Sequence, residues 1–251
     1  MQDYPSQQVV FDLLIAIGFT LACGWLVAAT TYRLCQWART PLPLPIPLTP
    51  APRTRAGVAG RLFLELILFR SLARANRTTW FASLLFHYAL LFLLLMHLRF
   101  VFVQMPFFLL PFIRYSGWAF LALMLGLLIL LARRVLIDRL RYISAPSDYL
   151  HIILIMVIGL SGASVKRLWP VDLYEVGQFV RGALSFQWQP LPEGGALVIH
   201  ILLVMLLMLI FPISKLMHGL GVLFSPTFNQ PDNASVINEK PSSNSQSLSD
   251  T

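Results

Sequence analysis

The second apolar stretch of the chain reads WFASLLFHYALLFLLLMHLRFVFV, from Trp80 to Val103. It is long enough to cross a bilayer, because a transmembrane helix needs about 20 mostly apolar residues. The basic side chains within it are His87, His97 and Arg99. Polar side chains are expensive at membrane depth and usually serve a function there. The stretch therefore predicts a membrane helix whose histidines are candidate functional residues.

The composition of the whole chain points the same way. Of 251 residues, 57% are hydrophobic and 12% are charged, whereas a soluble domain has about 25% charged residues. The net charge of +8 raises nucleic acid as a partner. The arginines, however, lie in loops beside apolar runs, as is typical of membrane proteins. We therefore expect lipid as the surroundings and no nucleic-acid partner.

Five apolar runs predict an all-α membrane protein, a bundle of five transmembrane helices. In hydrocarbon a helix satisfies all its backbone hydrogen bonds internally, which is why we assign every run to a helix. The expected spans are 9–31, 80–103, 115–132, 149–165 and 195–216. Together they form one expected domain, residues 1–228. The polar, serine-rich tail 229–251 is expected to be disordered.

The basic residues predict how the bundle is oriented. Fourteen of them lie in connections on one side of the spans and four on the other. The rich side is expected to be cytoplasmic. This places the N-terminus outside and the C-terminus in the cytoplasm of a multi-pass protein, expected in a bacterial inner membrane.

The long cytoplasmic connection, 41–75, has two distinct parts. Residues Pro41–Pro52 read PLPLPIPLTPAP, which favours an extended polyproline path. Residues Arg61–Arg74 read RLFLELILFRSLAR, too short and charged to span, which suggests an amphipathic helix on the membrane surface. A soluble partner or membrane lipid could cover it. On the other side, the connection 166–194 contains aromatic residues that suit interfacial anchoring.

Four of the five histidines lie on only two runs. His87 and His97 are on the second run, and His200 and His218 are on the fifth. Because these runs cross in opposite directions, His97 and His200 share the outer depth, and His87 and His218 share the cytoplasmic depth. Each pair can supply both axial nitrogens to a haem iron, an arrangement that suits electron transfer. The chain is therefore predicted to bind two haem b groups, an outer and an inner one.

The two histidine spacings do not match in length. Ten residues of helix rise about 15 Å and eighteen rise about 27 Å. Helix tilt, the reach of the imidazoles, and a kink at Pro212, between His200 and His218, are the candidates for absorbing the difference.

Two further basic residues have open roles. His151 begins the fourth run, where it suits a packing or interfacial position, with a contact to a haem propionate as the alternative. Arg99, two residues after His97, is a candidate partner for an outer-haem propionate, the alternative being extension to the membrane surface.

The histidine pattern resembles the gamma subunit family of respiratory nitrate reductases, a membrane cytochrome b with five spans. That family has a ten-residue histidine spacing on span two and an eighteen-residue spacing on span five. The stretch LFRSLARANRTTWFASLLFHYALLFLLLMHLRF resembles the DsrM branch of the family, the cytochrome b subunit of the Dsr membrane complex in sulfur metabolism. The resemblance covers residues 10 to 224.

The resemblance implies electron exchange between membrane quinone, near the outer haem, and a cytoplasmic iron–sulfur subunit of the heterodisulfide-reductase-like type. Other membrane or periplasmic subunits of a redox complex are implied as well. The basic residue that helps hold quinone in the nitrate-reductase branch has no counterpart here. Arg114 and Tyr115, which open the third run, are the nearest candidates for a quinone site.

Two alternatives stay open at the level of sequence. One is a nitrate-reductase-type subunit that oxidises quinol for a molybdenum partner. The other is a haem-free membrane anchor or transporter, in which the histidines would serve packing alone. The direction of electron flow is open too.

Overall fold

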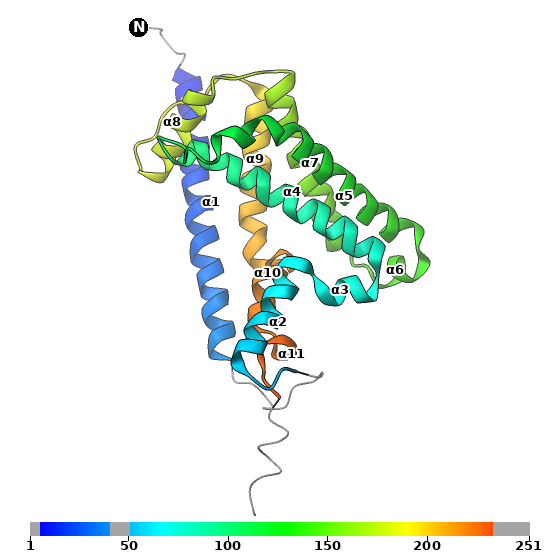
Figure 1. Ribbon diagram of the computed structural model, residues 1–251. Coiled ribbons are helices and arrows are strands. Elements are labelled where there is room, and N and C mark those ends of the chain that lie inside the picture. The colour runs from blue at the N-terminus through cyan, green and yellow to red at the C-terminus, as the bar shows by residue number, and fades with distance from the viewer. Residues whose placement is uncertain (1–5, 41–50, 233–251) are drawn as a thin grey trace, which may run out of the picture. The chain divides into compact units, whose positions relative to one another are not determined.

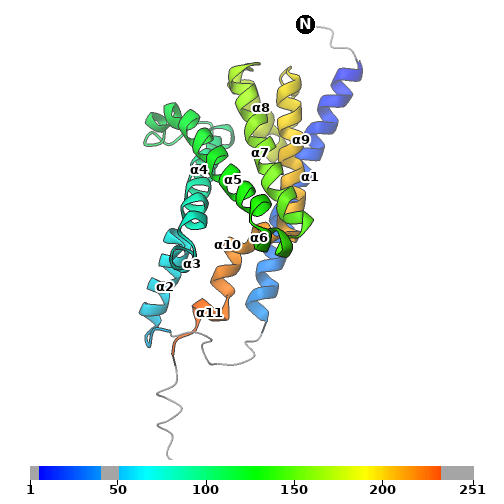
Figure 2. The same ribbon diagram turned by 90° about the vertical axis from the view of Figure 1, so that its right-hand side faces the viewer.

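The computed structural model describes residues 6–40 and 51–232. Every regular element within them is helical (Figures 1 and 2). The described part contains five helices long and apolar enough to cross a membrane, which confirms the all-helical class and the five long apolar helices. They are α1 (Ser6–Arg39), α4 (Arg77–Val101), α5 (Ser116–Leu136), α7 (Pro146–Arg167) and α9 (Gly195–Ile210).

These helices leave large apolar side chains uncovered. Leu21 and Val27 on α1 are each 67% exposed, and Leu94 on α4 is 58% exposed. Apolar surface on this scale is stable only against lipid or another protein. The predictions for the proline-rich residues 41–50 and for most of the tail, 233–251, fall outside the described residues.

The chain divides into two compact units. The first contains residues 1–32 and 72–216, and the second contains residues 33–71 and 217–251. Four of the long helices lie wholly in the first unit, whereas α1 passes from the first into the second.

Helices α4 and α5 of the first unit approach each other so closely that a side chain has no room between them. A Cβ on Gly126 of α5 would stand 2.8 Å from Phe86 Cβ, and 2.9 Å from both the Ala82 carbonyl oxygen and the Phe86 nitrogen on α4. Association of membrane helices depends on such close packing, because lipid gives no hydrophobic drive between helices. Gly126 therefore positions the turn of α4 that carries His87.

A second core joins α1 and α9 to a helix that the sequence analysis did not predict, α8 (Leu173–Leu184). Asp172 caps α8 by accepting a hydrogen bond of 2.7 Å from the backbone nitrogen of Tyr174. Figure 1 shows α8 against the N-terminal half of α1. The buried core residues come from all three helices and the loop after α8: Ile15, Ala16, Phe19, Val176, Phe179, Ala183, Leu191, Leu197 and Ile201.

Asp12 is the one acidic residue of the first apolar run. It lies on the face of α1 that carries the core residues Ile15, Ala16 and Phe19. Asp12 is 4% exposed, and the Gln8 side-chain amide donates a 3.0 Å hydrogen bond to it. Further along, Thr20 Oγ1 lies 2.9 Å from the Ala183 carbonyl oxygen on α8. Asp12 and Thr20 of α1 thus both have hydrogen-bond partners for their buried polar groups.

A cluster of ion pairs joins the end of α5, the start of α7 and Lys215 within the first unit. Asp148, in the first turn of α7, accepts hydrogen bonds from Arg134 at the end of α5 (3.1 Å) and from Lys215 (2.8 Å). Its carboxylate also caps α7 by accepting from the backbone nitrogen of Ala145 at 3.0 Å. Between α5 and α7 lies the short helix α6 (Asp138–Ile143).

Helix α9 ends at Ile210, and a 3₁₀ turn, η2 (Phe211–Ile213), follows it. Pro212 is fully buried in this turn. Proline has no N–H to continue the helical hydrogen bonds, so a helix is expected to break here. The position that the sequence offered for a kink is where the α-helix is interrupted.

The predicted single amphipathic helix is two helices in the structure. α2 (Arg55–Leu68) ends at Phe69, whose φ of 48° is left-handed, and α3 (Arg70–Ala75) follows. The Glu65 carboxylate fixes the bend by accepting hydrogen bonds from Ser71 N (3.0 Å) and Ser71 Oγ (2.7 Å).

The C-terminal segment packs on α2 within this second unit. It forms α10 (His218–Gly221), a 3₁₀ turn and α11 (Pro226–Asn229). The Arg61 guanidinium of α2 lies 5.4 Å from the centre of the Phe228 ring. The backbone nitrogen of Asp232 donates to the Pro52 carbonyl at 3.0 Å.

The contact at Gly126 gives a stability prediction. Gly126→Ala should destabilise the protein by about 1–3 kcal/mol, the usual cost of overpacking, because its Cβ would meet backbone atoms of α4. Gly24→Ala on α1 is the matched control, since nothing lies within 4 Å of its Cβ position. The measurement is the thermal midpoint of each variant in detergent. Equal midpoints for the two variants would contradict the close packing of α4 and α5.

Candidate functional site

His97 on α4 and His200 on α9 lie together in the first unit. The centres of their imidazole rings are 6.4 Å apart, and the ring planes differ by 27°. The structure thus brings together the two histidines that the sequence analysis assigned to the outer haem.

Hydrogen bonds orient both rings. His97 Nδ1 lies 2.6 Å from the Leu93 carbonyl oxygen, one turn back on α4. His200 Nδ1 lies 2.9 Å from Ser161 Oγ on α7, and that hydroxyl donates to the Ile158 carbonyl at 2.9 Å. The serine oxygen is therefore left to accept the Nδ1–H of His200. Metal-binding histidines typically donate one ring N–H to such an oxygen and ligate through the other nitrogen.

The separation of the rings fits two axial ligands of one metal ion. Two metal–nitrogen bonds of about 2 Å, with about 1.1 Å from each nitrogen to its ring centre, give about 6 Å between ring centres. The observed 6.4 Å agrees with this value. The ring separation of His97 and His200 is therefore compatible with ligation of one haem iron, for which Nε2 of each ring would be the ligand atom.

The backbone of α7 packs directly against the His200 ring. A Cβ on Gly162 would stand 3.0 Å from His200 Cε1 and 3.4 Å from its Nδ1. Glycine at this position lets the imidazole lie directly on the α7 backbone, beside Ser161. Two neighbouring residues of α7 thus set both the hydrogen bond and the position of the ring.

His87 shows the same local pattern as His97. Its Nδ1 lies 2.8 Å from the Ser83 carbonyl oxygen one turn back on α4. His87 belongs to the first unit, and His218, which begins α10, belongs to the second. The pairing of His87 with His218 stays a prediction from the sequence spacing.

Two arginines lie near His97. Arg99 Nε is buried without a hydrogen-bond partner, and its guanidinium lies 4.7 Å from the centre of the Phe100 ring. Arg181 on α8 donates to the Phe100 carbonyl at 3.4 Å. In the sequence analysis Arg181 was one of the four basic residues on the outer side, within the connection 166–194, and it had no role in the site. The signal that would have placed it is the helical spacing of Val176, Phe179 and Ala183 after the capping residue Asp172.

The other predicted site residues lie apart from this pair. Arg114 and Tyr115 end the 3₁₀ turn η1 (Leu110–Tyr115) and stack on each other, the guanidinium 4.8 Å from the ring centre. No described contact joins them to His97 or His200. His151 is half-buried in the second turn of α7, with no hydrogen bond from its side chain within the described ranges.

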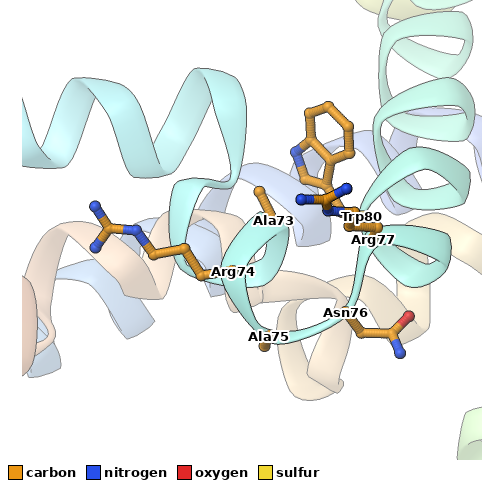
Figure 3. A pocket seen from close by; sticks show the side chains of 6 residues that line it. All are labelled: Ala73, Arg74, Ala75, Asn76, Arg77 and Trp80. Atoms are coloured by element: carbon orange, nitrogen blue, oxygen red, sulfur yellow. The ribbon is translucent and has the colours of Figure 1, made fainter.

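A surface hollow marks the turn between α3 and α4 (Figure 3). Its lining residues are Ala73, Arg74, Ala75, Asn76, Arg77 and Trp80. In Figure 3 the Arg74 side chain extends away from Arg77 and Trp80, so the two charges do not converge on one ligand. Trp80 is also about 25 Å of helix away from His97. We assign no role to this hollow.

Across residues 6–40 and 51–232, no three His, Cys, Asp or Glu side chains gather to hold a metal ion. An iron held in a porphyrin takes its four equatorial ligands from the macrocycle and needs only two from the protein. The paired histidines are therefore the candidate site within the described residues.

Comparison with known proteins agrees with this arrangement. Residues 71–230 match the nitrate reductase gamma subunit family. The Hdr-like menaquinol oxidoreductase cytochrome b-like subunit of Archaeoglobus fulgidus is 30% identical, over 89% of this chain and 80% of that protein. The protein of the same name from Archaeoglobus profundus is 32% identical, over 82% of this chain and 75% of that protein. A match over more than half of the chain, with relatives that align over most of it, shows that the chain belongs to the nitrate reductase gamma subunit family.

Proposed function

We propose that this chain is the membrane cytochrome b subunit of a quinol oxidoreductase complex and that it binds two b-type haems. The observation that carries the proposal is the His97–His200 pair, with its ring separation of 6.4 Å and both Nδ1 atoms directed at oxygens. The second haem, at His87 and His218, rests on the sequence spacing alone.

The roles of the residues follow from their contacts. A bound haem would supply reversible one-electron chemistry. His97 and His200 would hold its iron, so the group would carry electrons rather than bind oxygen. Leu93 and Ser161 hold each imidazole in one tautomer and so raise its basicity as a ligand. Gly162 keeps the His200 ring against α7.

The names of the relatives support quinol, and menaquinol in particular, as the electron donor. In the proposed complex, quinol is oxidised on the outer side and the electrons leave at the cytoplasmic face. The predicted orientation, with the N-terminus outside, rests on the basic residues. Arg114 and Tyr115 stay the candidates for the quinone site, on resemblance alone.

The proposed electron acceptor is a cytoplasmic iron–sulfur subunit of the heterodisulfide-reductase-like type, as the Hdr-like name of both relatives suggests. Dissimilatory sulfur metabolism and the DsrM branch are the finer proposals, supported by the stretch from Leu68 to Phe100. Both relatives are archaeal, so the bacterial inner membrane stays a prediction from the sequence.

A nitrate-reductase-type role is the second candidate, favoured by the family that residues 71–230 match. Purification of the native complex distinguishes the two. A heterodisulfide-reductase-like subunit in the complex supports the first proposal, and a molybdenum subunit supports the second.

The haem proposal is tested by the reduced-minus-oxidised spectrum and haem content of the purified native complex. A b-type α-band and two haems per chain are expected. His97→Ala and His200→Ala should each remove the same haem, because both residues would ligate one iron. Leu94→Ala, which changes an exposed side chain of α4, is the control and should retain both haems. A wild-type complex without an α-band would rule out the cytochrome, and loss of different haems in the two histidine variants would rule out the pairing.

The close contact between Gly162 of α7 and the His200 ring gives a second test. Gly162→Ala should displace the His200 ring, because its Cβ would lie 3.0 Å from Cε1. The expected result is lower occupancy or a shifted α-band for the haem that His97→Ala removes, with the other haem unchanged. Gly24→Ala, whose Cβ meets nothing within 4 Å, should match the wild type. A wild-type spectrum for Gly162→Ala would argue against His200 as a ligand in this position.

The hydroxyl of Ser161 gives a third test. Ser161→Ala removes the acceptor of the His200 Nδ1–H and should raise the midpoint potential of this haem alone. A less basic imidazole donates less charge to ferric iron, so the ferrous state becomes relatively more stable. A weakened ligand should also lower haem retention. Ser164→Ala, one turn along α7 with its hydroxyl on the Leu160 carbonyl, is the matched control. Identical redox titrations and haem contents for both variants would show that Ser161 does not support a ligand.

A further inference from the structure

We propose that Arg99 and Arg181 together hold the two propionate carboxylates of the haem bound by His97 and His200. This inference rests on the proposed function and extends it to a named pair of positioning residues. The sequence offered Arg99 alone for such a contact, and Arg181 enters through the fold of α8.

Both arginines contact the same residue. The Arg99 guanidinium lies 4.7 Å from the centre of the Phe100 ring, and Arg181 Nη1 lies 3.4 Å from the Phe100 carbonyl oxygen. The Phe100 ring is itself 5.9 Å from the His97 ring, centre to centre. The turn of α4 that carries His97, a candidate iron ligand, also carries Phe100, which both arginines contact.

Neither cation has a carboxylate partner in the described part of the chain. The recorded ion pairs join Arg134, Arg141 and Lys215 to Asp138 and Asp148. Arg99 Nε is, in addition, a buried donor with nothing to donate to. Two like charges repel most strongly where water is scarce, and a charged side chain at membrane depth is expensive unless it is paired. A ligand with two negative charges would remove both penalties.

The residues of α8 determine where the Arg181 side chain lies. A Cβ on Gly177, one turn earlier, would stand 2.7 Å from Arg181 Nη1 and 3.3 Å from Nη2. Glycine at 177 therefore clears the helix surface on which the guanidinium lies. The helix itself is anchored by Phe179, which is 0% exposed. The side chain is consequently directed toward Phe100.

The chemistry of the ligand favours haem propionates. A b-type haem carries two carboxylates on one edge of the macrocycle, and arginine presents a planar fork of donors that pairs with a carboxylate in two-point fashion. A phospholipid phosphate offers related chemistry and would lie at the same membrane depth. The experiment has to separate these two sources.

The test is a redox titration of the purified native complex in three variants: Arg99→Gln, Arg181→Gln and the double variant. Reduction adds one negative charge to the haem, so removal of a nearby cation should lower its midpoint potential. Each single variant should lower the potential of the haem that His97→Ala removes, and the double variant should lower it further and release part of this haem. Arg167→Gln at the end of α7 is the control, because it removes the same charge from a residue that contacts neither Phe100 nor His97 in the described structure.

Arg181→Lys separates charge from geometry. It keeps the cation but not the planar fork, and should restore part of the shift seen in Arg181→Gln. The inference is overturned if the Arg99 and Arg181 variants shift the potential no more than Arg167→Gln, or if they shift the other haem. It is also overturned if the variants lose bound phospholipid while the potential stays at the wild-type value. A wild-type complex without a b-type α-band would instead refute the proposed function itself.

Discussion

An imidazole inside a bilayer needs an oxygen for its N–H, because no water is present to solvate it. The described histidines of α4 and α9 meet this constraint in two ways. His87 and His97 use the carbonyl one turn back on their own helix, whereas His200 uses a hydroxyl from a neighbouring helix. In His97 and His200 Nδ1 is engaged, so Nε2 would be the nitrogen that binds a metal in the proposed site. The rest of the site depends on this division of the two ring nitrogens.

Close backbone approach is the second requirement. Gly126 lets α5 press against α4, and Gly162 lets the His200 ring press against α7. In both places a single methyl group would have to displace backbone or imidazole atoms. The packing of α5 on α4 and the position of the His200 ring thus both depend on a glycine that has no side chain. Such close packing is expected where lipid offers no hydrophobic drive for helix association.

Much of this arrangement could be predicted from the sequence because its causes are local. Apolar runs of about 20 residues predict spans in any context, and the approach of His97 and His200 follows from antiparallel helices. Helix α8 was not predicted because its apolar face is short and contains two glycines. That face can be recognised only from its packing against α1 and α9. The contact of Arg181 with Phe100 was missed with it. The bend at Phe69 was also hidden, since it depends on the Glu65 carboxylate reaching Ser71.

The two oxygen partners of the His97–His200 pair differ in what a mutation can change. The Leu93 carbonyl belongs to the backbone, and no substitution removes it. Ser161 Oγ belongs to a side chain, so a single codon change can replace it with a methyl group, an amide or a carboxylate. In the proposed site, the basicity of His97 is therefore fixed by the fold, whereas that of His200 is open to selection. If the proposed function holds, a lineage that moved to a quinol of different potential could adjust this haem through residue 161 without disturbing either helix that carries a histidine.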